Sequence, residues 1–268
     1  GGTFDGQGAV LRANGFGPHL CVLRGCKNVI IEDVIFRDSA AWDVHLMTCD
    51  RTTLRNIRVL TNRDVLKTDG VDLDSCTHTV LEDSFIYAGD DGACIKTYGQ
   101  HPADDVLVQR NVILTLKSAL KIGSETHGDV NQVRFVDNDV VECDRGMSLY
   151  IEDGAKVNHT QFVGNVFEDF IPDARQRLID FYTFNRNGGG YIEHVLIKDC
   201  EVDSEWPRPS TIFMTHGYIH DVRVENFKVM GKPCKTLQEA NILIESLPNH
   251  DIRKANVRDL VFHVDKVK

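Results

Sequence analysis

Acidic residues crowd into one short stretch, Lys67–Lys96, with the sequence KTDGVDLDSCTHTVLEDSFIYAGDDGACIK. Asp69, Asp90 and Asp91 stand there beside glycines and short apolar runs, so little side-chain bulk separates their carboxylates. Carboxylates at that density cannot all ionise freely, and at least one pKa should rise. A neutral acid beside an ionised carboxylate is the pair that glycoside hydrolysis uses. A calcium site or a solvated row of turn-capping aspartates is the alternative interpretation.

An internal repeat predicts how these carboxylates are positioned. Segments with one apolar pattern begin at Leu54, Leu81, Val108, Phe135 and Phe162, so each step is 27 residues. They are rich in Val, Ile and Phe and broken by Gly, Asn and Asp, which favours short strands over helices. Parallel strands need long crossovers, and a chain that winds each turn onto the last supplies one at every step. We therefore expect a parallel β-helix with rungs about 4.8 Å apart, forming one domain over residues 1–268.

A second strand in each coil is predicted from five-residue segments that align in one phase: WDVHL, DGVDL, DGACI, SALKI, RGMSL and, less closely, STIFM. Their third and fifth residues are mostly apolar and should point inward by strand alternation. The first and fourth residues should then form two outward columns. These are Trp42, Asp69, Asp91, Ser118 and Arg145 in one, and His45, Asp72, Cys94, Lys121 and Ser148 in the other.

Composition excludes several functional classes. The formal net charge of −10 argues against a nucleic-acid partner, and no apolar run approaches the length of a membrane span. The opening GGTFDGQG lacks the charged-then-apolar layout of a signal peptide. The eight cysteines show no CxxC spacing, so we expect small buried residues and no metal site.

Four motifs together carry a family resemblance: GGTFDGQG, SAAWDVHLMTC, TDGVDL and AGDDGACIK. In this order they resemble glycoside hydrolase family 28, the polygalacturonase family, through about Gly146. The resemblance implies a right-handed, single-stranded parallel β-helix, here of about nine to ten coils. It also implies an inverting hydrolase acting on a pectin-type polysaccharide, with no cofactor and a secreted or periplasmic location.

Matching the motifs residue by residue assigns roles. Asp90 matches the family's general acid, and Asp69 and Asp91 match the pair that activates the hydrolytic water. Lys96 closes the GDD motif and would hold a carboxylate or the sugar. The remaining matches are Asp72, as a structural or subsite residue, and Trp42 and His45, as groove-lining or packing residues.

Two family motifs are missing. Ser118 stands at the position of the family's GHG histidine, and Ser148 and Tyr150 stand at the arginine and lysine of its RIK motif. The side chains that usually bind a galacturonate carboxylate in this family are therefore absent, so the substrate could contain a different sugar. Lys121 and Arg145 are candidates for the positive charge, with a surface role on the solenoid as the alternative. Glu125 and His127 are candidates for the role of the histidine, with a turn role as the alternative, and Tyr150 is a candidate subsite residue.

Two other functions fit the same predicted fold. In a calcium-dependent lyase the acids would bind Ca²⁺, and Lys121 or Arg145 would abstract a proton. In a non-catalytic β-helix the groove would only bind carbohydrate. The sugar, its linkage and the oligomeric state do not follow from the sequence.

Overall fold

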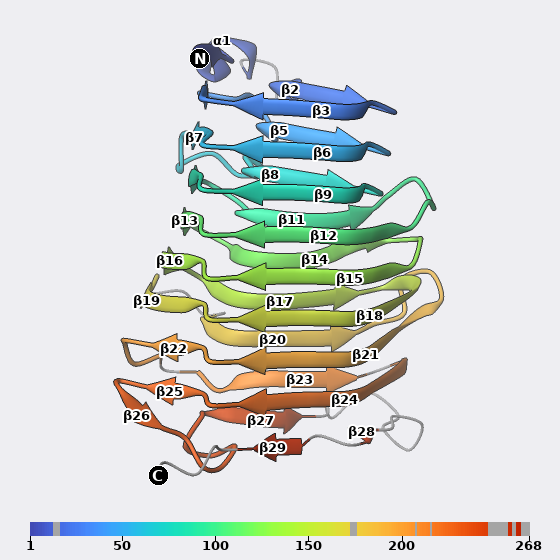
Figure 1. Ribbon diagram of the computed structural model, residues 1–268, viewed down its shortest axis with the longest axis vertical. Coiled ribbons are helices and arrows are strands. Elements are labelled where there is room, and N and C mark those ends of the chain that lie inside the picture. The colour runs from blue at the N-terminus through green and yellow to red at the C-terminus, as the bar shows by residue number, and fades with distance from the viewer. Residues whose placement is uncertain are drawn as a thin grey trace.

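The chain forms a solenoid of stacked turns in a computed structural model, which describes residues 1–12, 17–171, 176–206, 208–214, 216–245, 257–258 and 261–263. Three parallel sheets run the length of the solenoid, and each turn contributes one strand to each sheet (Figure 1). In these residues the sheets contain ten, nine and ten strands. This arrangement confirms the predicted parallel β-helix, with about eight turns where about nine to ten were expected.

The strands follow one another in a fixed order around each turn. Sheet A contains β1 (Gly2–Asp5), β4 (Val34–Arg37), β7 (Arg58–Leu60), β10 (Phe85–Ala88), β13 (Val112–Thr115), β16 (Asp139–Cys143), β19 (Val166–Phe170), β22 (Glu201–Val202), β25 (Lys228–Val229) and β26 (Lys232–Pro233). Sheet B contains β2 (Cys21–Arg24), β5 (Val44–Met47), β8 (Val71–Asp74), β11 (Ala93–Thr97), β14 (Ser118–Thr126), β17 (Arg145–Ile151), β20 (Arg177–Thr183), β23 (Ser210–Met214) and β27 (Ile242–Glu245). Sheet C contains β3 (Lys27–Glu32), β6 (Asp50–Arg55), β9 (Thr77–Glu82), β12 (Ala103–Gln109), β15 (Val130–Val136), β18 (Asp153–Val163), β21 (Gly189–Lys198), β24 (Gly217–Glu225) and β28 (Val257–Arg258). A short helix, α1 (Gly8–Leu11), lies near the N-terminus, β29 (Val261–His263) pairs with β24, and β25 and β26 pair antiparallel.

Each repeated apolar segment covers two strands, where the sequence suggested one. The segment that begins at Leu54 starts in β6, turns at Asn56 and ends in β7. Asn56 has a φ of 49°, a left-handed conformation that asparagine and aspartate tolerate better than most residues. A single residue therefore turns the chain from sheet C into sheet A, and each coil has three strands.

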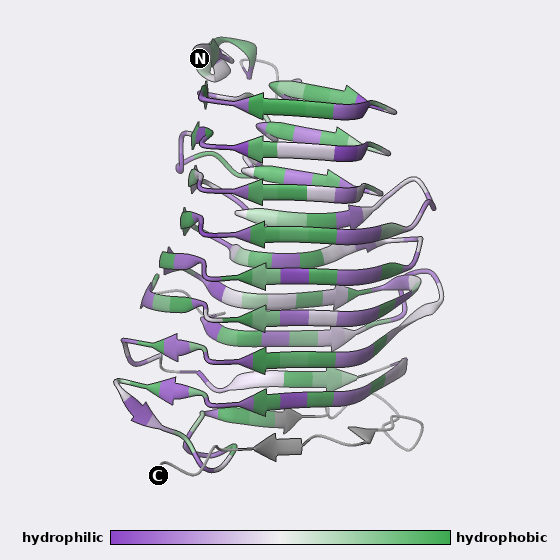
Figure 2. Cartoon of the chain, viewed as in Figure 1, coloured by the Kyte–Doolittle hydropathy of each residue, from purple (hydrophilic) through white to green (hydrophobic). Residues whose placement is uncertain are grey.

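The interior matches the predicted alternation. Val71 and Leu73 of β8, and Ile95 of the next rung, are fully buried. Cross-strand pairs put His45 opposite Asp72, Asp72 opposite Cys94, Cys94 opposite Lys121 and Lys121 opposite Ser148. The predicted second column is thus confirmed. In Figure 2 the hydrophobic colour recurs at the same place in successive strands of sheet C, as stacking in register requires.

Buried asparagines hold the register at the bend between sheets C and A. The side-chain amide of Asn111 donates to Asn138 Oδ1 at 3.0 Å, and that of Asn138 donates to Asn165 Oδ1 at 2.9 Å. All three side chains are buried. Because a buried polar group without a partner is costly, slipping the stack by one residue would break this ladder.

Two parts of the predicted second strand need correction. The segment 171–190 is an insertion that interrupts the 27-residue repeat, yet it contains β20, which is a full member of sheet B. In the segment STIFM, Thr211 pairs with Asp180, whereas the expected alignment would have paired Phe213 with Asp180. The segment is therefore displaced by two residues, which preserves its inward and outward faces but shifts its place along the strand.

The cysteines match the prediction of small packed residues. All eight are free thiols; six are buried, and Cys21 and Cys26 are half-buried. Across the described part of the chain, no helix has the length and apolar character needed to span a membrane.

Candidate active site

Asp69 and Asp91 occupy equivalent places in successive turns, just before β8 and β11. The backbone N–H of Gly70 donates to the carbonyl of Asp91 at 2.8 Å, which ties the two turns together at this point. Both aspartates are almost fully buried, at 4% and 3% exposure, whereas Asp90 is half-buried. The Lys67 backbone N–H donates to Asp90 Oδ2 at 3.0 Å. The three predicted catalytic carboxylates therefore lie on adjacent rungs of one sheet edge.

The small residue after Asp91 is required by the interior. A Cβ at Gly92 would lie 2.7 Å from Ile113 Cγ2 and 2.9 Å from the Ala119 carbonyl oxygen. Neither contact is tolerable for carbon, so only glycine lets the chain bend inward here. Because of this bend, the Asp91 side chain lies on the outer face of the sheet, whereas Ala93 and Ile95 of β11 pack in the core.

Lys96 joins several carboxylates. Its Nζ lies 2.9 Å from Glu125 Oε2, 3.7 Å from Asp72 Oδ1 and 3.8 Å from Asp69 Oδ2, and it stands over the Trp42 ring at 4.7 Å from the centroid. Lys96 as a whole is 3% exposed. A cation buried to this degree requires such partners, so Lys96 organises the acidic cluster.

Lys121 contacts Asp91. Its Nζ lies 2.5 Å from Asp91 Oδ2, and the backbone N–H of Ser118 donates to Asp91 Oδ1 at 3.1 Å. Both oxygens of Asp91 are therefore held by donors. The sequence made Lys121 a candidate source of positive charge for the substrate. In the structure its ammonium contacts the Asp91 carboxylate instead.

The carboxyl groups divide into members whose pKa is raised and one whose pKa is lowered. Burial first, and then the neighbouring Asp91, raise the pKa of Asp90. Burial and Asp72 raise the pKa of Asp69 well above its usual range. Burial also opposes ionisation of Asp91, but nearby cations, chiefly Lys121 and Lys96, outweigh it and lower that pKa. Neighbouring carboxyl groups whose pKa values shift in opposite directions are the arrangement that general acid and general base roles require in glycoside hydrolysis.

Asp72 is the most enclosed of the acids. Burial raises its pKa to about 7, against the charges of Lys96 and His45. Neither of its carboxylate oxygens has a hydrogen-bond partner among the described residues, although Lys96 lies within ion-pair distance. Its position beneath the cluster fits the structural role that sequence matching allowed.

Aromatic residues border the acids on the N-terminal side. Trp42 stacks on His19 at 4.5 Å between ring centroids, and His45 meets the Trp42 ring edge-on at 4.9 Å. They line a cleft of about 400 Å³ that Tyr98 also borders. Burial lowers the pKa of His19 to about 4. His19 was missed by sequence reasoning, because no repeat position or motif marks it.

Polar side chains continue the site on the C-terminal side. Arg145 Nε donates to Ser118 Oγ at 3.0 Å, and Ser148 Oγ donates to the same oxygen at 3.0 Å. Tyr150 donates to Asp180 Oδ2 at 2.5 Å. Asp180 also was missed; its signal was present, since RLIDF at 177–181 aligns with RGMSL at 145–149.

The two candidates for the role of the missing family histidine, Glu125 and His127, lie in different surroundings. Glu125 lies within the cluster through its bond to Lys96. His127 instead contacts Asp153, with Nε2 3.8 Å from Oδ2, and the Tyr98 ring. No group of three or more His, Cys, Asp or Glu within the described ranges is arranged to hold a metal ion.

The family model for glycosyl hydrolases family 28 matches residues 1–168, more than half of the chain. The chain belongs to this family. The matched part of this family 28 protein contains β1 to β18 and the start of β19. It therefore includes the three predicted catalytic carboxylates, Asp69, Asp90 and Asp91.

Named relatives agree with this membership. A probable polygalacturonase of Vitis vinifera is 28% identical over 164 residues, 55% of this chain and 33% of the relative. An exopolygalacturonase of Arabidopsis thaliana is 27% identical over 202 residues, 70% of this chain and 46% of the relative. The chain therefore spans a third to about half of the length of these two relatives.

Solved structures share the fold. The polygalacturonase from Erwinia carotovora superposes with a TM-score of 0.69 and 20% identity, covering 91% of this chain and 69% of that one. The hyperthermoactive exopolygalacturonase from Thermotoga maritima gives 0.65 and 20%, covering 83% and 57%.

Proposed function

We propose that the chain is an inverting glycoside hydrolase that cleaves a pectin-type polysaccharide outside the cytoplasm, in the medium or the periplasm. The observation that carries the proposal is the opposite pKa shift of adjacent residues, raised for Asp90 and lowered for Asp91. Family membership and the polygalacturonase names of the relatives support the same chemistry.

In this mechanism Asp90 donates its proton to the glycosidic oxygen as the bond to the anomeric carbon breaks. Asp91, ionised and held by Lys121, accepts a proton from the water that attacks the opposite face of the sugar. Asp69, on the adjoining rung, orients that water beside Asp91. One water is consumed and one glycosidic bond is broken; Asp91 then releases the proton it accepted to solvent, and Asp90 regains a proton from solvent.

The residues around the cluster favour a substrate other than plain galacturonate. Lys121 is bound to Asp91, Arg145 bonds Ser118, and Ser148 supplies a hydroxyl where the family has a cation. A pectic chain with neutral or mixed sugars needs fewer cations than polygalacturonate. Trp42 and His45 then bound the subsites on the N-terminal side.

A panel digestion tests the proposal. Polygalacturonan, rhamnogalacturonan and neutral glycans are each incubated with wild type, with Asp90→Asn and with Asp50→Asn, an outward residue of sheet C that serves as control. We expect new reducing ends without ultraviolet absorbance, lowered by about 10³-fold in Asp90→Asn and unchanged in the control. A folded, fully active Asp90→Asn would refute the assignment. Absorbance lost on chelation would indicate a lyase, and tight binding without cleavage a carbohydrate-binding protein.

A further inference from the structure

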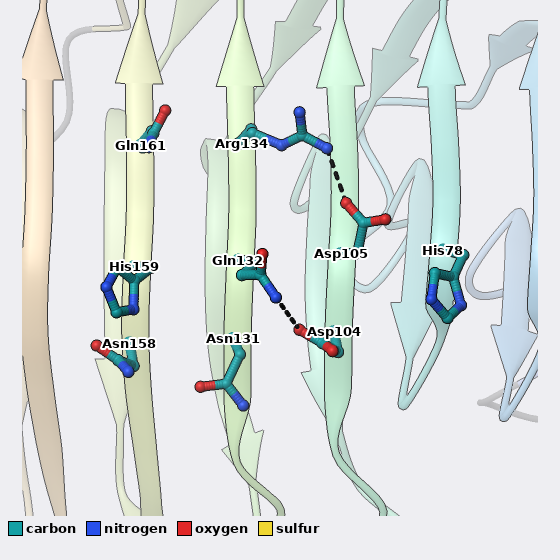
Figure 3. Close-up of a pocket in the computed structure, with 9 residues that line it drawn as sticks. All are labelled: His78, Asp104, Asp105, Asn131, Gln132, Arg134, Asn158, His159 and Gln161. Atoms are coloured by element: carbon teal, nitrogen blue, oxygen red, sulfur yellow. Dashed lines mark hydrogen bonds and ion pairs between the residues drawn. The ribbon is translucent and has the colours of Figure 1, made fainter.

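A polar groove of about 820 Å³ crosses the outward face of sheet C. It extends over β9, β12, β15 and β18, whereas the acidic cluster lies on sheet B (Figure 3). Figure 1 shows sheet C in front of sheet B, with the core of the solenoid between them. The groove is therefore a separate surface, and the proposed catalysis makes no use of it.

The groove arises from a kink repeated in every rung. His78, Asp105, Gln132 and His159 have φ angles of 49°, 51°, 52° and 54°, all left-handed. Pairing skips this position: Asp104 pairs with Asn131, and pairing resumes at Val106 with Val133. A left-handed residue interrupts strand alternation, so two neighbouring side chains emerge outward instead of one. Stacked kinks form a trough along the solenoid axis.

The trough carries planar polar groups with little net charge. Gln132 Nε2 donates to Asp104 Oδ1 at 3.2 Å, and Arg134 Nη2 donates to Asp105 Oδ1 at 2.8 Å (Figure 3). The positive charge of Arg134 thus neutralises the negative charge of Asp105. Amides and carboxylates together offer donors and acceptors to hydroxyl groups. A polyanion would meet Asp104 and Asp105, so the surface suits an uncharged, hydroxyl-rich chain.

One lining residue holds an unused acceptor. The side-chain carbonyl oxygen of Asn158 is buried and has no hydrogen-bond partner in the described part of the chain. An acceptor left in this state is costly. Rotating the Asn158 side chain toward a bound hydroxyl breaks no bond of that oxygen and gives it a donor.

We propose that this groove binds one chain of a neutral polysaccharide, lying along the solenoid axis, as a glycan site separate from the acidic cluster. Rungs recur about every 4.8 Å, close to the advance of one pyranose ring in an extended glycan. Each rung therefore offers the same pair of outward polar positions to successive sugars. Such a site would hold the protein on a neutral wall polysaccharide while the acidic cluster acts on the pectin-type chain of the proposed function.

Affinity gel electrophoresis of the full chain tests this site, with galactan, arabinan, hydroxyethyl cellulose or polygalacturonate cast in the gel. The test variant is Gln132→Gly/Gln161→Ala, in which glycine keeps the left-handed φ without strain. The matched control is Asn56→Gly, which has a φ of 49° at the bend between β6 and β7 and lies outside the groove. A single Gln132→Gly variant repeats the test with a smaller change.

We expect at least one neutral glycan to retard wild type, Asn56→Gly and Asp90→Asn equally. The double variant should bind about tenfold more weakly, as the loss of two neutral hydrogen-bonding side chains implies. Wild type that no neutral glycan retards, or a folded double variant that binds like wild type, would overturn the proposal. Binding by Asp90→Asn keeps this result distinct from the outcome of the hydrolysis test.

Discussion

Asp69 and Asp91 occupy the same position in successive turns, yet their environments move their pKa values in opposite directions. Burial and Asp72 raise the pKa of Asp69, whereas Lys121 and Lys96 overcome burial and lower that of Asp91. The difference comes from the next rung, since Lys121 reaches Asp91 at 2.5 Å. The repeat places equivalent carboxylates side by side, and single cations on neighbouring turns make them chemically unequal.

Removing the cation that the acids share should have the largest effect. Lys96→Met leaves Asp69, Asp72 and Glu125 without their common partner. We expect a loss of about 3–5 kcal/mol in unfolding free energy, because breaking a buried pair strands uncompensated charge. Urea unfolding measures this loss.

The control is Lys198→Met, which breaks the exposed pair with Glu225 at 3.4 Å. Exposed pairs contribute about 0–1 kcal/mol. If both variants lost the same stability, the cluster would not depend on Lys96.

Removing the cation specific to Asp91 should make it resemble Asp69. In Lys121→Met the pKa of Asp91 rises, because its principal stabilising charge is lost. Below that raised pKa the carboxylate is protonated and cannot accept a proton from water. We expect about 10²-fold lower activity near neutral pH, with the acid limb of the pH–rate profile moved to higher pH.

Lys156→Met, on sheet C, is the matched control for the charge removed, since Lys156 pairs with Glu193 there. An unshifted acid limb in Lys121→Met would show that Lys121 does not set the ionisation of Asp91.

The smallest effect should come from Asp72→Asn. The folded pKa of Asp72 is about 7, above the unfolded value of about 3.9. Between these values the native state binds more protons than the unfolded state, so stability falls as pH rises. Asp72→Asn should reduce that fall by up to about 2 kcal/mol between pH 5 and pH 7, measured by urea unfolding at each pH.

Asp83→Asn provides a contrast of opposite sign, because Arg110 lowers the pKa of that exposed carboxylate. A pH dependence of stability that is identical in wild type and Asp72→Asn would contradict the raised pKa.

The repeat and the motifs predicted much of this arrangement from sequence. A period of 27 residues and strand alternation placed Asp72, Cys94 and Lys121 in one column, as the pairing confirms. The third strand of each turn was missed because a single left-handed residue such as Asn56 makes the bend, and apolar periodicity passes through it. Asp180 was missed because an insertion hid its register.

Side-chain pairing across rungs lay beyond sequence reasoning. Lys121 and Cys94 are direct neighbours in the column, but Lys121 extends past Cys94 to reach Asp91. Column order does not determine which carboxylate a long, flexible side chain meets. The roles of the acids therefore followed from family motifs, and their charges from the structure.

In the proposed mechanism, Asp91 directs water to the face of the sugar opposite Asp90. Proton NMR of the anomeric signals, recorded in the first minutes of digestion before mutarotation, tests it most directly. We expect the first product to have the anomeric configuration opposite to that of the bond cleaved. Initial product with the original configuration would contradict it, since a covalent intermediate would then take the place of direct attack by water.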